Sequence, residues 1–593
     1  MTKFKINSLL LPMKGHYFLY NGGTAPVVPF MPVFAKQLGF SSVVVGTLYT
    51  VLPIAGMVAK PLFGGLADRL KWHKKLFMFF LALTGILFFL INFTPNANEG
   101  KVGPGVDLDC GAVTLFKTCN VTDNCALTRL LVYAGNGTVD CHIDCPEVVG
   151  SEWNEELCKQ WGLSQYCKSN ADHPMVFDAK VPLAHTEQIE NCIYFRVQTA
   201  IFEEKSVIPY CNAQISTSNC HVTCKEPVVN EVLHVRTEEA SAKSWSFIYF
   251  AFLMLTSWIS MAVVVSIGDA ICFELLGSKP ANYGKQRVWG SVGWGIFSVL
   301  AGFLVDEFSQ GRTEKDYSVV FYMCLIILSV DFLFCTRLKV SHTQMSASIV
   351  HDIGRLLSQL RINIFLLWCI TVGLSTGLLW GFLFWHLEEL AAAQGCSSLE
   401  WIKTLEGLVM GVQCFGGELP FFFISSWVLK KIGHIHAMSM VLFGFGLRFF
   451  LYFWLVDPWW VLPIELLNGV TFGIFYATMA SYASKIAPPG TEATVQGLVG
   501  AVFEGIGVSL GSLIGGLMFQ KIGGANTFLA FSIMSWVLFC LHVVVQFFMQ
   551  RATPNEWQQQ QEEVKEFAMT AMYASPQDAI QMLDEQPDDL SRR

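Results

Sequence analysis

Residues 43–75 read VVVGTLYTVLPIAGMVAKPLFGGLADRLKWHKK and change character along their length. The first part, 43–66, holds a single charged side chain, Lys60. It is long enough to cross a bilayer as a helix, which takes about 20 apolar residues. Asp68, Arg69 and a run of basic side chains follow directly. Because membrane proteins keep Lys and Arg in short cytoplasmic loops, the stretch predicts a transmembrane helix that ends in the cytoplasm.

The whole chain has the composition of a polytopic membrane protein. Of its 593 residues, 53% are hydrophobic and 15% are charged, against about 25% charged residues in soluble domains. This composition excludes a disordered chain and argues against a wholly soluble one. We predict a transmembrane helix in each of twelve apolar segments. They lie near residues 15–37, 43–66, 75–93, 244–267, 288–306, 318–337, 361–386, 403–427, 434–456, 459–483, 491–519 and 525–548.

The basic residues of the short loops predict the orientation. The loops after the second, fourth, sixth and eighth segments are rich in Lys and Arg, and all lie on one side if the N-terminus is cytoplasmic. Residues 94–243 then lie outside the cytosol, and their 20 acidic and 11 basic residues suit an acidic external domain. Both termini are predicted to be cytoplasmic, at the plasma membrane or, alternatively, an endosomal or lysosomal membrane. The charge balance argues against nucleic-acid binding.

These boundaries divide the chain into six parts. Three helices (1–93) precede the external insert (94–243), and three more (244–337) complete a first half. A cytoplasmic linker (338–360) leads to a second half of six helices (361–548). The last residues (549–593) are polar and acidic, so we expect a flexible cytoplasmic tail.

The insert is rich in cysteine, as small oxidised domains are. It holds 11 of the chain's 18 cysteines, and Cys396 in a predicted external loop makes an even number. We predict disulfides, one of them between Cys396 and the insert, and no metal. Two Cys-x-x-x-Cys spacings leave a zinc cluster as the competing interpretation. The twelve residues are Cys110, Cys119, Cys125, Cys141, Cys145, Cys158, Cys167, Cys192, Cys211, Cys220, Cys224 and Cys396. Sequons at Asn120 and Asn136 predict glycosylation.

Two motifs resemble those of a known family. Gly64, Asp68, Arg69 and Lys74 have the spacing of the loop after the second helix in the major facilitator superfamily, although Lys71 stands where a glycine is expected. A second motif at the fifth helix resembles the sugar and nucleoside proton-symporter branch. It consists of Asp269, Tyr283, Gly284, Arg287, Trp289, Gly290 and Ser291. With the run GHYFLYNGGTAP at 15–26, the chain is most similar to the major facilitator superfamily domain-containing protein 6 group.

The resemblance implies an all-α membrane fold. It implies 12 transmembrane helices in two pseudo-symmetric six-helix halves, with a disulfide-rich extracellular insert between helices 3 and 4 and alternating access to a central cavity. The Asp68 loop would act as a gating latch, with ordinary flanking charge as the alternative. Tyr20, Asn21, Lys60 and Trp380 are candidates for the substrate cavity, and Lys60 could equally snorkel to the interface.

Ionisable side chains inside helices are costly and mark functional sites. Glu418, Arg448, Glu465 and Glu504 lie in predicted helices of the second half. Symporters of the branch resembled carry an acid, an arginine and an acid in helices 8, 9 and 10, where the first three of these residues occur. We predict that changing pairing partners couples solute movement to a proton. A static ion pair that fixes helix register is the alternative.

Two other acidic residues are predicted to be peripheral. Glu406 lies near the outer end of the eighth helix, and we expect it at the membrane interface. Asp331 lies near the cytoplasmic end of the sixth helix, and we expect a capping or loop contact.

The sequence offers no signature of an enzyme. It has no phosphate loop, no His-Glu-x-x-His and no nucleophile elbow, so we expect neither catalysis nor a cofactor. The prediction is a secondary active transporter of a small polar solute, sugar- or nucleoside-like, coupled to H⁺. The alternative is a cell-surface receptor that binds a protein or glycan through the insert, which is larger than transport requires.

Overall fold

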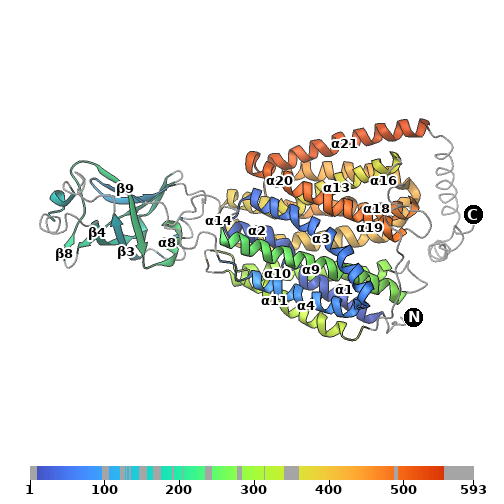
Figure 1. The fold of residues 1–593 in the computed structure, drawn as a ribbon. Coiled ribbons are helices and arrows are strands. Elements are labelled where there is room, and N and C mark those ends of the chain that lie inside the picture. The colour runs from blue at the N-terminus through green and yellow to red at the C-terminus, as the bar shows by residue number, and fades with distance from the viewer. Residues whose placement is uncertain are drawn as a thin grey trace, which may run out of the picture.

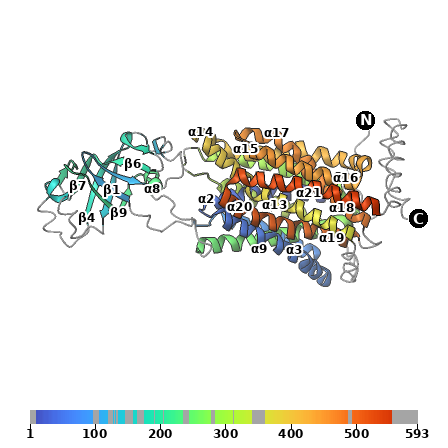
Figure 2. The same ribbon diagram turned by 90° about the horizontal axis from the view of Figure 1, so that it is seen from above.

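A computed structural model gives the fold of the chain, a bundle of long helices with a β-sheet domain beyond one end (Figures 1 and 2). We call that end of the bundle the insert end. The opposite end, where α1 begins and α21 stops, is the far end. The structure describes residues 10–95, 106–119, 127, 130–131, 135, 137–145, 157–163, 175–189, 192–202, 205–233, 244–276, 283–310, 312, 314–338, 360–486 and 492–552.

The first half of the bundle forms from strongly apolar helices that precede and follow the sheet domain. These are α1 (Leu11–Thr24), η1 (Val28–Phe30), α2 (Met31–Gln37), α3 (Ser42–Leu70), α4 (His73–Ile91), α9 (Trp245–Leu276), α10 (Tyr283–Phe308) and α11 (Ser318–Cys335). The first predicted helix is divided into three pieces around Pro26, Pro29 and Pro32. Proline lacks the N–H that continues a helix, which explains the division.

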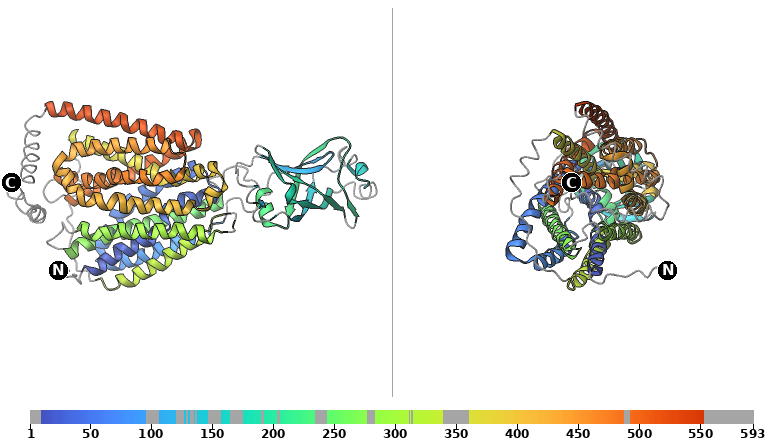
Figure 3. Two further views of the ribbon diagram at one scale, coloured as in Figure 1. Left: turned by 180° about the vertical axis from the view of Figure 1, so that it is seen from behind. Right: turned by 90° about the vertical axis from the view of Figure 1, so that its right-hand side faces the viewer.

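The second half contains the C-terminal helices, grouped beside the first half when the bundle is viewed along its length (Figure 3). Its longer helices are α13 (Leu360–Gln394), α15 (Ile402–Val412), α16 (Leu419–Phe453), α18 (Phe475–Ile486), α19 (Glu492–Ala501), α20 (Ser509–Ile522) and α21 (Gly524–Ala552). The shorter ones are α14 (Cys396–Glu400), η5 (Gln413–Glu418), η6 (Pro458–Trp460), α17 (Val461–Ile464), η7 (Glu465–Leu467), η8 (Gly469–Ile474) and η9 (Val502–Val508).

Ten helices in the described residues are long and apolar enough to cross a membrane, against the twelve predicted. One of these stretches, Ile402–Phe453, is 52 residues long. At 1.5 Å per residue it exceeds twice the roughly 30 Å of a bilayer core. It bends at Gly433, whose φ of 75° and ψ of 165° are not helical. The divided first helix has no piece of the 18 residues that a span requires.

The insert folds as a nine-stranded sheet in the order β5-β6-β2-β1-β9-β3-β4-β7-β8. Its strand pairs are antiparallel, and β9 lies at the centre of the sheet between β1 and β3. The strands are β1 (Val106–Cys110), β2 (Thr114–Thr118), β3 (Thr138–Cys145), β4 (Met175–Pro182), β5 (Glu187–Ile189), β6 (Cys192–Arg196), β7 (Thr199–Phe202), β8 (Lys205–Val207) and β9 (Ile215–Cys224). The short helices η3 (Leu183–His185) and α8 (Pro227–Leu233) complete it.

Four disulfides staple this sheet, as the cysteine content predicts. They join Cys110 to Cys211, Cys119 to Cys192, Cys141 to Cys224 and Cys145 to Cys220. The two pairs with zinc-like spacing are therefore bonded to each other across β3 and β9, which overturns the zinc interpretation for them. Cys158 and Cys396 are disulfide-bonded as well. Cys125, Cys167 and both predicted glycosylation sites, Asn120 and Asn136, lie outside the described residues.

Candidate functional site: buried charges between the two halves

A buried ion pair lies in the second half between α16 and η7. Arg448 Nη2 bonds to Glu465 Oε2, and the two side chains are 1% and 0% exposed. Arg448 Nε donates to the hydroxyl of Tyr452 at 2.7 Å. Its Nη1 donates to Asn468 Oδ1 at 2.9 Å and to Thr471 Oγ1 at 2.8 Å. Each guanidinium nitrogen therefore has an oxygen partner, which is the condition for burying such a charge in an apolar body.

Both oxygens of the Glu465 carboxylate also accept hydrogen bonds. Gln413 Nε2 donates to its Oε2 at 2.7 Å, and the Tyr452 hydroxyl donates to its Oε1. Gln413 begins η5, one of three π-helical turns in the second half. The other two, η8 and η9, carry Thr471 and Glu504. π-helical turns occur often at functional sites, and here they place polar side chains in otherwise apolar helices.

Glu418 reaches from the second half to the first. It is the last residue of η5, and its Oε2 accepts a hydrogen bond of 3.1 Å from Ser291 Oγ on α10. Within the described part of the chain Glu418 has no salt-bridge partner, in contrast to Glu465. A Cβ on Gly290 would stand 2.8 Å from Asn21 Nδ2. Glycine therefore allows α1 to approach α10 beside this contact.

Lys60 and Glu504 make a second polar contact between the halves. Lys60 Nζ on α3 lies 2.9 Å from Glu504 Oε2 on η9, and their side chains are 36% and 46% exposed. Both residues are candidates from the sequence, in which nothing indicates that they form a pair. Neither of the two alternatives for Lys60 included an ion pair with the other half.

The contacts of Lys60 with Glu504 and of Ser291 with Glu418 lie at the edge of the region where the two halves pack tightly. Toward the insert end, a Cβ on Gly46 of α3 would stand 2.6 Å from the Ser512 carbonyl oxygen, and one on Gly302 of α10 only 2.0 Å from the Lys403 carbonyl oxygen. Toward the far end, the Cβ positions of Gly64 and Gly284 on the same two helices have no described atom within 4 Å. The halves are packed backbone to backbone at the insert end, whereas Gly64 and Gly284, beyond the Lys60 and Glu418 contacts, face open space in the described part of the chain.

Charged side chains reinforce the closed insert end. Lys36 Nζ on α2 lies 2.8 Å from Glu388 Oε2 on α13, which joins the two halves. Lys403 on α15 bonds to the other oxygen of Glu388 and lies 2.9 Å from Glu406 Oε1. Lys403 is 1% exposed and Glu406 is 0% exposed. The prediction of an interfacial Glu406 is therefore wrong, because a lysine one helical turn earlier neutralises it inside the protein.

A further acidic residue bridges the halves at the same end. Asp306, at the end of α10, accepts from Lys315 Nζ at 2.5 Å through Oδ1. Its Oδ2 accepts from the backbone N–H of Thr404 at 2.6 Å, in the second half. Lys315 also donates to the carbonyl oxygen of Glu400 at 2.8 Å. In the sequence these residues are only acidic and basic side chains beside loops. Their contacts join residues up to 98 positions apart, so the sequence alone does not pair them.

The motif at the fifth helix and the predicted latch loop both have contacts at the far end. Asp269 on α9 accepts from the Tyr17 hydroxyl and from Arg287 Nη1, each at 2.7 Å, and so links α1, α9 and α10. Lys74 Nζ donates to the carbonyl oxygens of Thr336 and Leu338, just past α11. Both sets of contacts lie within the first half.

Lys71 has a φ of 54°, the left-handed region that glycine favours. A glycine is expected at this position of the loop because the backbone there adopts a positive φ. The side chains of Asp68 and Tyr283 lie outside the described residues. Arg69 is exposed.

The remaining candidates are spread over the bundle. Tyr20 is buried, and its hydroxyl lies 3.4 Å from the Met261 carbonyl oxygen. Trp289 and Trp380 are exposed. Asp331 is fully buried and bonds to His16, so the prediction of a capping or loop contact is wrong.

Comparison with known proteins decides the family. Residues 10–530 match the model of the MFS_1-like family. The chain belongs to this family. A relative from Xenopus laevis, major facilitator superfamily domain-containing protein 6-like protein A, is 22% identical to this MFS_1-like chain over 561 residues, with 89% of each protein covered.

Two further matches come from transport proteins. A maltose permease of Geobacillus stearothermophilus is 24% identical over 295 residues, which cover 48% of this chain and 69% of the permease. The crystal structure of the nucleoside transporter NupG aligns with a TM-score of 0.56 at 14% identity, over 91% of this chain and 98% of that one. The fold is therefore that of a transporter of the major facilitator superfamily, a class of proteins that are not enzymes.

Proposed function

We propose that this protein is a secondary active transporter that moves a small polar solute together with a proton by alternating access. The observation that carries the proposal is the row of polar contacts at the level where the two halves part, Lys60 with Glu504 and Ser291 with Glu418. Charged groups in a membrane-spanning body are costly and mark the path of a solute or ion. Their position at the edge of the closed region places them where a solute entering between the halves would arrive.

The proposed topology has twelve crossings and cytoplasmic termini. The break at Gly433 would divide Ile402–Phe453 into two crossings, and the divided segment Leu11–Gln37 would supply the first crossing. With the insert outside the cytosol, the far end is cytoplasmic and the structure is inward-facing. This orientation puts the basic loop residues inside, in agreement with their distribution.

Glu418 is the stronger candidate for the proton site. Arg448 neutralises Glu465 within a complete hydrogen-bond network, so that carboxylate has little reason to bind a proton in this conformation. Glu418 has two neutral hydrogen-bond partners, the Ser291 hydroxyl and the Asn468 side chain, and no described cation. A protonated carboxyl group could keep one hydrogen bond with Ser291 while it loses its charge. Protonation would then change how strongly α10 and η5 hold each other, which couples the proton to the movement of the halves.

The solute is proposed to be sugar- or nucleoside-like. The names of the maltose permease and of the nucleoside transporter NupG support this class, and both solutes present many hydroxyl groups. The receptor alternative has no comparable support.

Uptake into proteoliposomes tests the proposal. We expect an inward proton gradient to drive accumulation of at least one member of a sugar and nucleoside panel. Glu418→Gln should lose gradient-driven accumulation by at least tenfold and retain solute exchange in the absence of a gradient. Glu307→Gln, which changes an exposed carboxylate on α10, is the matched control and should behave as wild type. Gradient-driven uptake that survives in Glu418→Gln would contradict the assignment of the proton site.

A further inference from the structure

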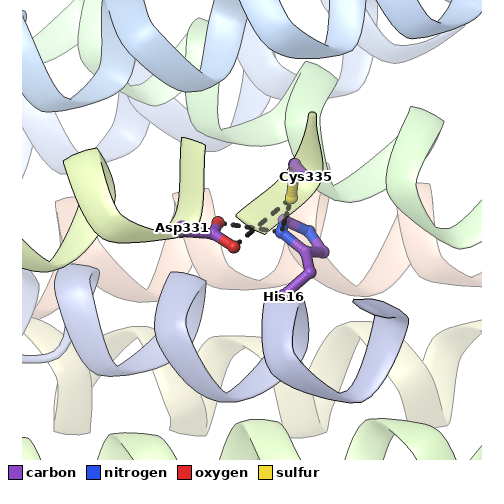
Figure 4. Close-up of side chains that lie close together, drawn as sticks. All are labelled: His16, Asp331 and Cys335. Atoms are coloured by element: carbon purple, nitrogen blue, oxygen red, sulfur yellow. Dashed lines mark hydrogen bonds and ion pairs between the residues drawn. The ribbon is translucent and has the colours of Figure 1, made fainter. Parts of the chain in front are cut away.

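A compact cluster of three potential metal ligands lies in the first half, away from the contacts between the halves. His16 on α1 faces Asp331 and Cys335 on α11, and all three side chains are buried (Figure 4). His16 Nδ1 lies 2.8 Å from Asp331 Oδ2. Cys335 Sγ lies 3.5 Å from His16 Nδ1 and 3.4 Å from Asp331 Oδ1. One nitrogen, one sulfur and the two oxygens of the Asp331 carboxylate, one beside His16 and the other beside Cys335, therefore lie close together.

The spacing of the donor atoms suits a tetrahedral ion. Zinc binds nitrogen and oxygen at about 2.0–2.2 Å and sulfur at about 2.3 Å, so donor atoms around it stand roughly 3.3–3.7 Å apart. The two distances to Cys335 Sγ already have this length. His16 Nδ1 is hydrogen-bonded to the other carboxylate oxygen, Oδ2, at 2.8 Å, so the carboxylate must turn until one oxygen faces both partners at the longer spacing. A small rotation of the Asp331 side chain provides that change.

The backbone holds these groups in place. Asp331 and Cys335 are four residues apart on α11, so they share one face of the helix. The His16 ring packs edge-on against Phe77. A Cβ on Gly268 of α9 would stand 3.3 Å from His16 Nε2 and 3.2 Å from Phe77, so glycine provides the room for the ring. Prearranged ligands of this kind lose little freedom when an ion binds.

The charges of the cluster also match a divalent ion. The carboxylate of Asp331 and the thiolate of Cys335 together carry two negative charges, so a bound divalent cation leaves the site neutral. A neutral site is what an apolar interior tolerates. On binding, the thiol proton passes to solvent and the His16 N–H moves to Nε2, which frees Nδ1 for the metal. His16 and Cys335 lie close to the far ends of their helices, so we expect an ion to enter from that side.

We propose that His16, Asp331 and Cys335 form a binding site for a divalent transition-metal ion of the zinc class, which fastens α1 to α11. Mixed nitrogen, sulfur and oxygen ligands favour zinc-like ions over magnesium or calcium. Three protein ligands leave a fourth position for water or another exchangeable ligand. The site lies entirely within the first half, so it is independent of the proposed proton coupling.

Cobalt spectroscopy on the purified full-length protein tests the site. After treatment with a chelator, we expect one Co²⁺ per chain, with a sulfur-to-cobalt charge-transfer band and the visible bands of tetrahedral cobalt. Cys335→Ser should lose the charge-transfer band and bind Co²⁺ at least tenfold more weakly. Cys324→Ser removes another buried thiol of α11 and is the matched control that should leave both unchanged. A wild-type protein without the band, or a Cys335→Ser protein that keeps it, would overturn the proposal.

A measurement without any substitution guards against a variant that fails to fold. The X-ray absorption spectrum of the zinc-loaded wild-type protein should show one sulfur together with nitrogen and oxygen in the first coordination shell. A shell of oxygen atoms alone would mean surface-bound zinc and would equally overturn the site.

Discussion

The two ends of the helical bundle differ in how the halves of the protein meet. At the insert end, glycine backbones touch at Gly46 and Gly302, and Lys36, Glu388 and Lys403 form ion pairs around them. At the far end, the helices that continue from these contacts separate, and each half is instead held together internally. Closure at the insert end thus combines shape with charge, whereas the contacts of Asp269 and Lys74 at the far end stay within the first half.

The largest expected effect comes from removing the buried cation at the insert end. Lys403→Met leaves Glu406 fully buried without its partner. Isolating one member of a buried ion pair costs about 3–5 kcal/mol, so we expect a clear fall in thermal stability of the purified protein. Glu406→Gln in the same chain should restore much of the loss. Lys521→Met, at an exposed position near the same end, is the control. Equal melting of Lys403→Met and wild type would show that charge contributes little to the closure.

The predicted tie between the insert and the second half should have the next largest effect. Cys396 is disulfide-bonded, while the chain's other six cysteines outside the insert are free, so its partner belongs to the insert. Disulfides that close long loops contribute about 2–4 kcal/mol. Cys396→Ser should therefore lower the thermal stability. In wild type, an insert cut from the helices by protease should stay attached to the second half until reductant is added. An insert that separates without reductant would contradict the tie.

Glycine substitutions compare the two ends directly. Gly302→Ala places a Cβ 2.0 Å from a backbone oxygen, which the closed insert end cannot accommodate. We expect at least a tenfold shift of population toward a conformation open at the insert end, or about 1.4 kcal/mol, measured by distances between spin labels. Gly64→Ala meets no described atom within 4 Å and should leave the distances unchanged. There it should stabilise the helix by about 0.5–1 kcal/mol. The same response from both variants would remove the distinction between the ends.

The smallest effect is expected where the halves part. Because Lys60 and Glu504 are more than one third exposed, solvent screens their attraction. A double-mutant cycle with Lys60→Met and Glu504→Gln should give a coupling energy of about 0.2–1 kcal/mol in thermal stability, which decreases as salt increases. A coupling energy of about 3–5 kcal/mol, as large as the stability loss expected for Lys403→Met, would mean that this contact belongs to the closed region.

The sequence predicted the parts of the fold that depend on local composition. The apolar segments give nearly every helix boundary within several residues, and the cysteine content of the insert predicts its disulfides. The nine-stranded sheet was not predicted, because its order joins strands more than 100 residues apart. The predicted boundary between the segments 403–427 and 434–456 agrees with the bend at Gly433, although the positive φ of this glycine was not predicted.

The candidate site was predicted only in part for a similar reason. Their charge within predicted helices marked Arg448 and Glu465 as candidates, and the structure places them in contact. Charge alone could not pair Lys60 with Glu504 across 444 positions, nor His16 with Asp331 across 315. His16 in an apolar helix was nevertheless a visible signal. An ionisable residue within each of two distant apolar helices suggests a search for its partner, which only the packing of the helices resolves.

The central place of β9 has a consequence for how the insert is attached. The chain enters the sheet through β1 and leaves it after β9, and these two strands are hydrogen-bonded neighbours, with Val106 opposite Cys220. The helices on either side of the insert, α4 and α9, also pack against each other. The points where the chain enters and leaves the insert therefore lie close together, both in the sheet and in the helical bundle. Domains with neighbouring ends of this kind can be inserted into other proteins. The bundle can acquire, lose or replace this domain without a change in the path of its own helices.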